Sequence, residues 1–238
     1  MKRYLMIAVL LGSMLHLQAQ PSHAGFDALL KKHVSASGNV DYKGFMTDKA
    51  KLNTYLNQLS KEYPSTKWTE NERMVFWINA YNAYTIKAII DNYPLKSITE
   101  IKPAGAESVW KLKNIVIGGK KVSLDAIENE ILRVEFNEPR IHFAINCASI
   151  SCPPLRNEAF TASKLEAQLT EQTRKFFKDK LRNKLSPSKA ELSQIFNWFN
   201  VDFTKKGSLI DFVNRYSDVK LNKNATITYL EYNWNLNE

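Results

Sequence analysis

Two cysteines and a histidine lie close together in the second half of the chain, and their side chains are able to do covalent chemistry. Cys147 follows His142 by five residues and precedes Cys152 by five, with Ser149 between the two cysteines. A thiol is mostly protonated near neutral pH, and a neighbouring imidazole can lower its pKa and hold it as the nucleophilic thiolate. The pattern therefore predicts Cys147 as a nucleophile with His142 as its base.

Two other interpretations of the same residues stay open. Cys147 and Cys152 enclose four residues, so they can form a small disulfide in an oxidising compartment, which removes the nucleophile. Alternatively, His142, Cys147 and Cys152 supply three zinc ligands. Their even spacing is not a recognised ligand pattern, and the sequence shows no obvious fourth ligand. We therefore expect no metal and no cofactor.

A catalytic imidazole needs a third group that orients it. Glu128, Asn79 and Asn82 are candidates because each is a polar residue within the apolar face of a predicted helix. A buried amide or carboxylate without partners costs about 1–3 kcal/mol, so each of them should be hydrogen-bonded. A structural role is the competing interpretation, in which the amides join helices and Glu128 pairs with Arg133 or Arg140. The predicted catalytic site is therefore Cys147, His142, Glu128, Asn79 and Asn82.

Several predicted elements position these residues. Thr69 and Glu72 form a capping box that opens a nearly all-apolar helix ending near Tyr93-Pro94. Residues 114–122 predict a hairpin with a Gly118-Gly119 turn, and Ser123 caps the helix that carries Glu128. Arg140–Cys147 is predicted as a strand, on which His142 and Cys147 face opposite ways unless the strand ends or bulges before Cys147.

The rest of the chain predicts further helices and a last strand. Capping boxes at Ser163 with Glu166 and at Ser188 with Glu191 predict two helices, a short one follows over residues 209–216, and residues 227–237 predict a strand. The tryptophans are expected in the core, and His23 and His33 on the surface. The predicted fold class is α+β, a single helix-rich domain around a small, mostly antiparallel sheet.

The first residues predict export. Lys2 and Arg3 precede the apolar run 5–11, and Ala19 lies near a plausible cleavage point, which together are typical of a signal peptide over residues 1–20. We expect a mature exported domain over residues 21–238, located in the periplasm or outside the cell. No later segment is apolar and long enough to span a membrane, so no integral membrane association is expected.

The composition excludes several classes of protein. Of the 238 residues 44% are hydrophobic and 24% are charged, which excludes a disordered chain, and Gly 8 with Pro 8 excludes a Gly/Pro-rich low-complexity protein. The formal net charge of +9 falls to +7 once Lys2 and Arg3 are removed with residues 1–20. This surplus is spread along the chain, so nucleic-acid binding is not expected.

Several segments resemble the family catalogued as domain of unknown function 547. These are GNVDYKGF (38–45), FWINAYNAYTI (76–86), SLDAIENEILR (123–133), PRIHFAINCASISCPPL (139–155), IFNWFNVDF (195–203) and YLEYNWNLN (229–237). The resemblance covers nearly the whole mature chain. The family occurs in bacterial exported proteins and, in other architectures, in plants and animals, and the resemblance brings no established activity. The family's motifs fall on Asn79, Asn82, Glu128, His142, Cys147, Ser149 and Cys152, which implies that these residues form a site.

Together, these patterns predict a thiol-dependent, Cys-His hydrolase or acyl transferase that acts on an amide bond, with peptide or cell-wall material as the expected substrate. Glu128 would orient His142, and Asn79 or Asn82 would support it. The alternative is a non-enzymatic extracytoplasmic binding or scaffold domain with a structural Cys147–Cys152 pair.

Overall fold

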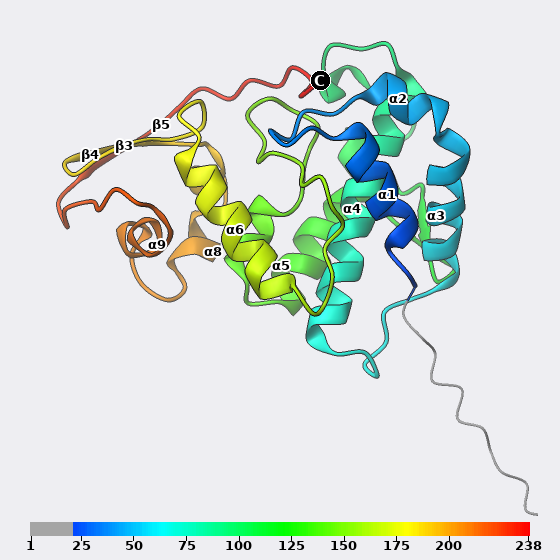
Figure 1. The fold of residues 1–238 in the computed structure, drawn as a ribbon, viewed down its shortest axis with the longest axis horizontal. Helices are drawn as coiled ribbons and strands as arrows, with labels where there is room; N and C mark the ends of the chain where they lie inside the picture. Colours follow the sequence, from blue (N-terminus) through cyan, green and yellow to red (C-terminus); the bar gives the residue numbers. More distant parts are fainter. Residues whose placement is uncertain (1–20) are drawn as a thin grey trace, which may run out of the picture.

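The computed structural model describes residues 21–238, and Figure 1 shows the path of the chain through them. Residues 1–20, which carry the predicted signal peptide, lie outside the described residues. The first elements are α1 (Ala24–His33), α2 (Tyr42–Thr47), α3 (Lys49–Lys61), α4 (Glu70–Asn92), η1 (Ile98–Glu100), η2 (Val109–Lys111), β1 (Ile115–Ile117), β2 (Lys120–Val122), η3 (Ala126–Leu132), α5 (Arg133–Glu135) and η4 (Pro139–Phe143). The later ones are α6 (Leu165–Lys178), β3 (Lys184–Ser186), β4 (Lys189–Leu192), α7 (Ile195–Trp198), α8 (Asn200–Thr204), α9 (Leu209–Tyr216) and β5 (Thr226–Tyr229).

Helix α4 is the buried centre of the first half of the molecule. The Thr69 hydroxyl accepts a hydrogen bond from the Glu72 backbone N–H, and the Glu72 carboxylate accepts one from the Thr69 backbone N–H, so the predicted capping box is confirmed. Its side chains are buried on nearly every face between Met74 and Ile90. Helices α2 and α3 pack against it, and Figure 1 shows α1 in the same group. The all-apolar pattern therefore predicted its central position correctly.

A second apolar cluster lies between α6 and the helices that follow it. Phe143 of η4 belongs to this cluster, with its ring centroid 4.9 Å from that of Phe176 and 5.7 Å from that of Phe196. Since η4 leads directly into the two cysteines, the packing of Phe143 anchors the segment that carries the candidate site.

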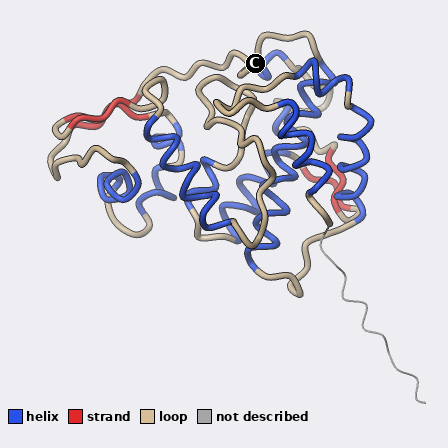
Figure 2. Tube along the Cα trace, in the orientation of Figure 1, coloured by secondary structure: helices blue, strands red, loops and turns tan. Residues whose placement is uncertain are grey.

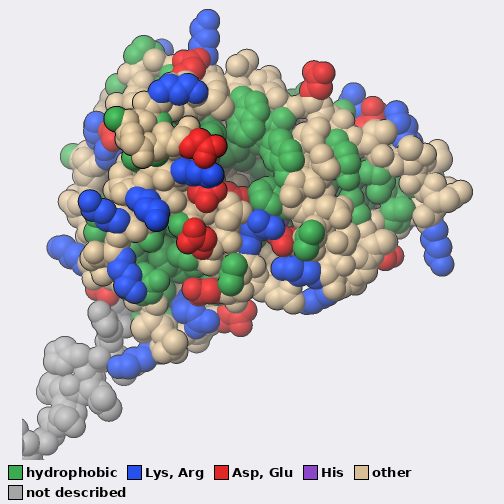
Figure 3. Space-filling model, turned by 180° about the vertical axis from the view of Figure 1, so that it is seen from behind, with side chains coloured by type: hydrophobic (Ala, Val, Ile, Leu, Met, Phe, Trp, Pro, Cys, Tyr) green, Lys and Arg blue, Asp and Glu red, His purple; other side chains and the backbone are tan. Residues whose placement is uncertain are grey.

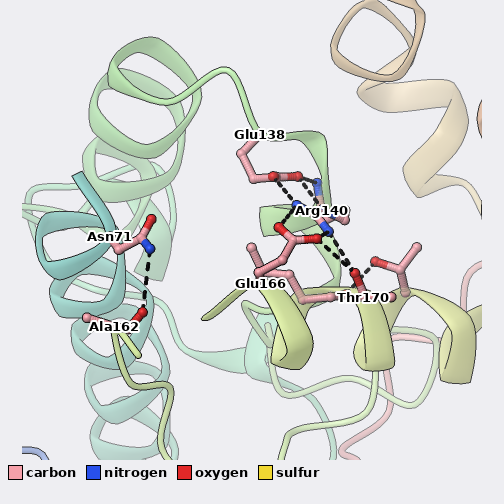
Figure 4. A network of polar contacts seen from close by, with 8 residues as sticks. Asn71, Glu138, Arg140, Ala162, Glu166 and Thr170 are labelled. Carbon is pink, nitrogen blue, oxygen red and sulfur yellow. Dashed lines mark hydrogen bonds and ion pairs between the residues drawn. The ribbon is translucent and has the colours of Figure 1, made fainter. Parts of the chain in front are cut away.

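Arg140 anchors the same segment by charge. Its buried guanidinium donates hydrogen bonds to the carboxylates of Glu138 and Glu166 and to the Thr170 hydroxyl, as Figure 4 shows. Glu166 and Thr170 both lie on α6, so this network joins η4 to α6. Arg140 is therefore engaged away from Glu128.

Strands form two small sheets, and the protein belongs to the α+β class (Figure 2). Strands β1 and β2 are antiparallel and joined by Gly118 and Gly119, whose φ angles of 54° and 76° suit glycine, so the predicted hairpin is confirmed. In the other sheet β4 pairs antiparallel with β3 and parallel with β5.

The predicted strand over Arg140–Cys147 is wrong. Pro139–Phe143 form the 3₁₀ helix η4, with Pro139 in its first turn and the Glu138 carboxylate accepting a hydrogen bond from the Arg140 backbone N–H. All the residues from Arg140 to Asn146 are buried. A short run that is buried on every side does not distinguish a strand from a turn of helix by its pattern.

Two of the predicted capping boxes are also wrong. Helix α6 begins at Leu165 without a side-chain cap, because the Glu166 carboxylate binds Arg140 instead. Ser188 and Glu191 flank the start of a strand, β4, in which Ala190 and Leu192 are buried and alternate with residues that retain solvent contact. The tertiary pairing with β3 and β5 therefore determined a structure that the local signal did not predict.

The C-terminal segment after β5 crosses from the three-stranded sheet to the helices of the first half (Figure 1). The Val40 N–H donates to the Asn237 carbonyl, and the Tyr42 hydroxyl donates to the Asn237 side chain at 2.7 Å. This crossing brings Tyr232 and Trp234 to the candidate site, although β5 itself is shorter than the predicted strand over residues 227–237.

Charged side chains of both signs are interspersed over the face drawn in Figure 3, and hydrophobic side chains gather around a hollow there. Within residues 21–238, no helix has the length and apolar character needed to cross a membrane. His33 is buried, contrary to the expected surface position, because its Nε2 lies 2.8 Å from the Asp48 carboxylate.

Candidate active site

A cleft of about 190 Å³ brings the predicted nucleophile, base and acid together. Its walls come from α4, η2, η3, η4, the cysteine-bearing loop, the turns around α7 and the C-terminal segment. The lining residues are Tyr81, Trp110, Asp125, Glu128, His142, Ile145, Cys147, Cys152, Pro153, Ile195, Trp198, Phe199, Tyr232 and Trp234. Six of these fourteen residues are Tyr, Trp or Phe, and the titratable groups Asp125, Glu128, His142, Cys147 and Cys152 lie among them.

The loop that carries the cysteines is held by Asn146. The Asn146 side chain accepts a hydrogen bond from the Ala148 N–H at 2.9 Å and donates one to the Pro153 carbonyl at 2.7 Å. Ala148 has a φ of 63°, a left-handed conformation that non-glycine residues rarely adopt and that often marks functional sites. The alternation expected on a strand does not apply to His142 and Cys147, because residues 139–143 form the 3₁₀ helix η4.

The half-buried Cys147 thiol is surrounded by groups that can hydrogen-bond with it. Its Sγ lies 2.8 Å from Cys152 Sγ, 3.4 Å from the Ser149 hydroxyl and 3.2 Å from the Tyr232 hydroxyl. The hydrogen bond from Cys152, opposed by burial and helped by Ser149 and Tyr232, lowers the pKa of Cys147 to about 7. Burial and the proximity of Cys147 raise the pKa of Cys152. The two thiols are therefore inequivalent, and Cys147 is the more easily ionised.

His142 is oriented by an aspartate that the sequence analysis did not identify. Its Nε2 lies 2.9 Å from Asp202 Oδ2, and its ring stacks on Phe199 with centroids 4.0 Å apart. Burial lowers the pKa of His142 against the opposing effect of Asp202. Because the carboxylate is an acceptor, Nε2 carries the proton and the Nδ1 lone pair points away from Asp202.

Asp202 itself is held as a carboxylate. Arg133 donates from Nε to Asp202 Oδ2 at 2.6 Å. Burial acts to raise the pKa of Asp202, but the hydrogen bonds from His142 and Arg133 outweigh it and hold that pKa well below its usual range. Asp202 therefore takes the geometric position expected of an orienting acid.

Glu128 lies on the other side of the imidazole. Its Oε1 is 3.9 Å from His142 Nδ1, and its Oε2 accepts a hydrogen bond from the Tyr81 hydroxyl at 3.2 Å. Burial, followed by the nearby charge of Cys147, raises the pKa of Glu128 from its usual 4.5 to about 7. The helix that carries it, η3, is a π-helix, a form that often occurs at functional sites.

The free energy of unfolding should depend on pH because of Glu128. Because the folded state holds its proton up to about pH 7 while the unfolded state loses it near 4.5, stability falls as pH rises through this window. Glu128→Gln, which does not titrate, should be more stable than wild type at pH 8 by about 2–3 kcal/mol and much closer to it at pH 4.5. Urea unfolding at both pH values measures the difference.

The exposed neighbour Glu130 provides the matched control. Glu130→Gln should differ from wild type equally little at both pH values, because an exposed carboxylate loses no hydration on folding. A Glu128→Gln variant whose stability difference from wild type is the same at pH 4.5 and pH 8 would contradict the buried, proton-binding carboxyl.

Asn79 and Asn82 are both buried and hydrogen-bonded as expected, but neither lines the cleft. Asn79 binds the carbonyl and the N–H of Phe160, at 2.9 and 3.0 Å. Asn82 donates to the Ala144 carbonyl at 2.9 Å and accepts from the Asn146 N–H at 2.8 Å. Asn82 therefore supports the cysteine loop directly, whereas Asn79 holds a segment away from it.

Aromatic residues of the cleft were missed as well. Trp77 is in the core, as expected of the tryptophans, but Trp110, Trp198 and Trp234 line the cleft, and Trp198 is 48% exposed. Trp198 stacks on Trp234 with ring centroids 6.0 Å apart. One feature of the sequence could have indicated Asp202. It is an acidic residue between Phe199 and Phe203, and an acid that is buried among such residues must find a partner.

The zinc interpretation finds no support in this geometry. Within residues 21–238, no three His, Cys, Asp or Glu side chains are grouped in a way that could hold a metal ion. The two cysteines contact each other and hydroxyl groups, and His142 contacts Asp202 and Phe199.

Comparison with known proteins places this site in a family. Residues 65–177 match the model described as "Protein of unknown function, DUF547", which is about half of the chain and includes Glu128, His142, both cysteines, Asn79 and Asn82. Asp202, Tyr232 and Trp198 lie outside the matched span. The comparisons with curated proteins and with solved structures each found no match. Through residues 65–177 the chain belongs to the DUF547 family.

Proposed function

We propose that the protein is a thiol-dependent hydrolase or acyl transferase that cleaves an amide bond, with Cys147 as the nucleophile. One observation carries the proposal: a thiol whose pKa is about 7 opens into the same cleft as a carboxyl group whose pKa is about 7. Groups that titrate near the working pH are the most effective nucleophiles and proton carriers there.

In the proposed reaction the Cys147 thiolate attacks the carbonyl carbon of the amide and forms a carbon–sulfur bond. The carbon–nitrogen bond then breaks, and the leaving amine takes a proton from protonated Glu128. Water, or a second amine in a transferase, attacks the resulting thioester and gives its proton to the Glu128 carboxylate. The Cys147 thiolate leaves, and both groups return to their starting states.

His142 and Asp202 prepare Glu128 for this role. Asp202 binds the protonated Nε2 of His142, so the Nδ1 lone pair faces Glu128 Oε1 at 3.9 Å. At 3.9 Å the two atoms lie beyond hydrogen-bond distance, so the proposed reaction requires them to approach before the lone pair can accept the proton that Glu128 takes up. Asp202 thus replaces Glu128 as the proposed orienting acid, and Asn82 is a positioning residue for the loop.

The walls of the cleft favour a substrate with an apolar or ring-shaped group beside the amide. Trp110, Trp198 and Trp234 expose aromatic surface there, and no lysine or arginine of residues 21–238 lines the cleft. Peptide and cell-wall material both contain amide bonds next to apolar side chains or sugar rings, so they remain the proposed substrates.

The proposal is tested with 4-nitrophenyl acetate as a reactive acyl donor and with purified peptidoglycan and casein peptides as natural amides. Wild-type protein should accumulate acetyl-Cys147, detected by mass spectrometry after an acid quench, and should release amines detected with fluorescamine. Cys147→Ser should do neither. If Cys147 is never acylated and both proteins behave alike, the function is wrong and the non-enzymatic binding or scaffold domain is favoured.

Alkylation gives an independent prediction about the thiol. Iodoacetamide should label Cys147 before Cys152, at a rate that rises with pH and levels off above about pH 7, because only the thiolate reacts. Tyr232→Phe removes a donor to the thiolate and should move the curve to higher pH. Peptide mapping after timed quenching measures both rates.

His142→Ala serves as the matched control for that curve. Within residues 21–238 the groups that hydrogen-bond with Cys147 Sγ are Cys152, Ser149 and Tyr232, so removal of the imidazole should leave the pH curve in place. This differs from the sequence-based expectation that His142 activates the thiol. A His142→Ala curve that moves to higher pH would restore the direct Cys-His pair.

Export to the periplasm or the cell exterior is part of the proposal, because Lys2, Arg3 and the following apolar run are typical of a signal peptide. Protein purified from the native cell envelope or medium should begin near residue 20. Recovery of the protein with an intact Met1 from that fraction would contradict export.

A further inference from the structure

We propose that Cys147 and Cys152 are a reversible thiol–disulfide couple, in which Cys147 attacks a low-molecular-weight or protein disulfide and Cys152 resolves the mixed disulfide. The inference deepens the proposed function, since it would regulate the same nucleophile. It does not depend on that function, because disulfide exchange at Cys147 needs no amide substrate.

The two sulfur atoms are already neighbours. Cys147 Sγ and Cys152 Sγ lie 2.8 Å apart while both cysteines are free thiols. The Asn146 side chain closes the loop across them by its hydrogen bonds to Ala148 and Pro153. Since these hydrogen bonds of the Asn146 side chain hold the loop in its closed form, joining the sulfurs requires little movement of the chain.

The order of attack follows from access and acidity. Both cysteines line the cleft, but Cys147 is only half-buried, whereas Cys152 is 4% exposed. The pKa of Cys147 is lowered and that of Cys152 is raised, so Cys147 supplies the thiolate that meets an incoming disulfide. The Cys147 backbone N–H donates to Cys152 Sγ at 2.8 Å, and this bond stabilises Cys152 when it must ionise to attack.

The chemistry balances as a two-step exchange. The Cys147 thiolate attacks one sulfur of the small disulfide, the new Cys147 mixed disulfide forms, and one thiolate leaves and takes a proton. Cys152 then loses its proton and attacks Cys147 Sγ, and the second thiolate leaves and is protonated. The protein dithiol is oxidised, and one external disulfide is reduced to two thiols.

Oxidation would switch off the proposed acyl transfer, because a sulfur in a disulfide has no thiolate to attack a carbonyl. Reduction by an external thiol restores the thiolate, and Cys147 is placed at the cleft where such a thiol can reach it. The oxidising conditions of an exported location make this exchange relevant to the protein.

The test equilibrates the full chain in buffers of graded reduced and oxidised glutathione. Samples are acid-quenched, denatured, labelled with N-ethylmaleimide and weighed by mass spectrometry. Protein from the reducing buffers should carry two N-ethylmaleimide labels. Oxidising buffers should give none, with a protein lighter by two hydrogen atoms, and dithiothreitol should restore both labels.

Single-cysteine variants test the roles of the two sulfurs. Cys152→Ser should stop at one glutathione adduct on Cys147, because no resolving thiol remains. Cys147→Ser should keep Cys152 as a free thiol over the same time. Two labels on the wild type in the most oxidising buffer, or equally fast adduct formation in both variants, would overturn the inference.

A parallel acetylation assay separates this inference from the proposed function. Oxidised protein should not be acetylated by 4-nitrophenyl acetate, and dithiothreitol should restore acetylation. If the disulfide cycles while the reduced protein is never acetylated, the acyl-transfer proposal fails and the redox couple stands.

Discussion

Asp202→Asn should slow the deacetylation of acetyl-Cys147 by about a hundredfold or more, which is the usual contribution of a positioned proton carrier. The Asp202 carboxylate fixes the proton on His142 Nε2, at 2.9 Å, and leaves Nδ1 free to face Glu128. An asparagine can present its N–H₂ to Nε2, which moves the proton to Nδ1 and removes that lone pair. The loss of acetyl from Cys147 is followed by mass spectrometry after removal of excess 4-nitrophenyl acetate.

The acetylation step should be unchanged in the same variant. The nitrophenolate leaving group needs no proton, and the groups that hydrogen-bond to Cys147 Sγ do not include Asp202. Lys205→Ala is the matched control, because Lys205 pairs with the other oxygen of Asp202 at 3.3 Å and its side chain is 39% exposed. A folded Asp202→Asn protein that deacetylates at the wild-type rate would show that His142 takes no part in the proton path.

Local sequence signals predicted the elements whose structure is set by neighbouring residues. The capping box at Thr69 and Glu72 and the hairpin at Gly118-Gly119 are both present, because each depends on contacts within a few residues. The capping boxes predicted at Ser163 and Ser188 are absent, because contacts with residues distant in sequence determine the structure there. The Glu166 carboxylate accepts a hydrogen bond from Arg140, and Glu191 lies in strand β4, which pairs with β5 more than 30 residues later.

The candidate site was predicted only where its members lie close in the chain or interrupt an apolar face. Cys147, His142 and Glu128 meet at one cleft, as the sequence suggested. Asp202 contacts His142 from 60 residues further along the chain, and Tyr232 contacts Cys147 from 85 residues further along. Such contacts depend on the tertiary packing of α8 and of the C-terminal segment, and a single sequence carries no measure of either.

Replacing Asn82 and Asn79 in turn distinguishes an effect on the stability of the fold from an effect on the cysteine loop. Each sits on α4 with two buried hydrogen bonds to backbone groups, so replacement by Ala leaves a carbonyl and an N–H unpaired in either case. Both variants should therefore lose about 2–6 kcal/mol of unfolding free energy, the sum for two unsatisfied groups. Urea unfolding at neutral pH measures these losses.

Reactivity of the thiol should distinguish the two variants. Asn82 holds Ala144 and Asn146, the residues that lead into Cys147, so Asn82→Ala should change both the rate and the pH midpoint of Cys147 alkylation. Asn79→Ala should leave both at wild-type values, because Phe160 lies outside the loop. If the two variants alter Cys147 alike, or neither does, then Asn82 acts on overall stability alone and the cysteine loop holds its geometry without it.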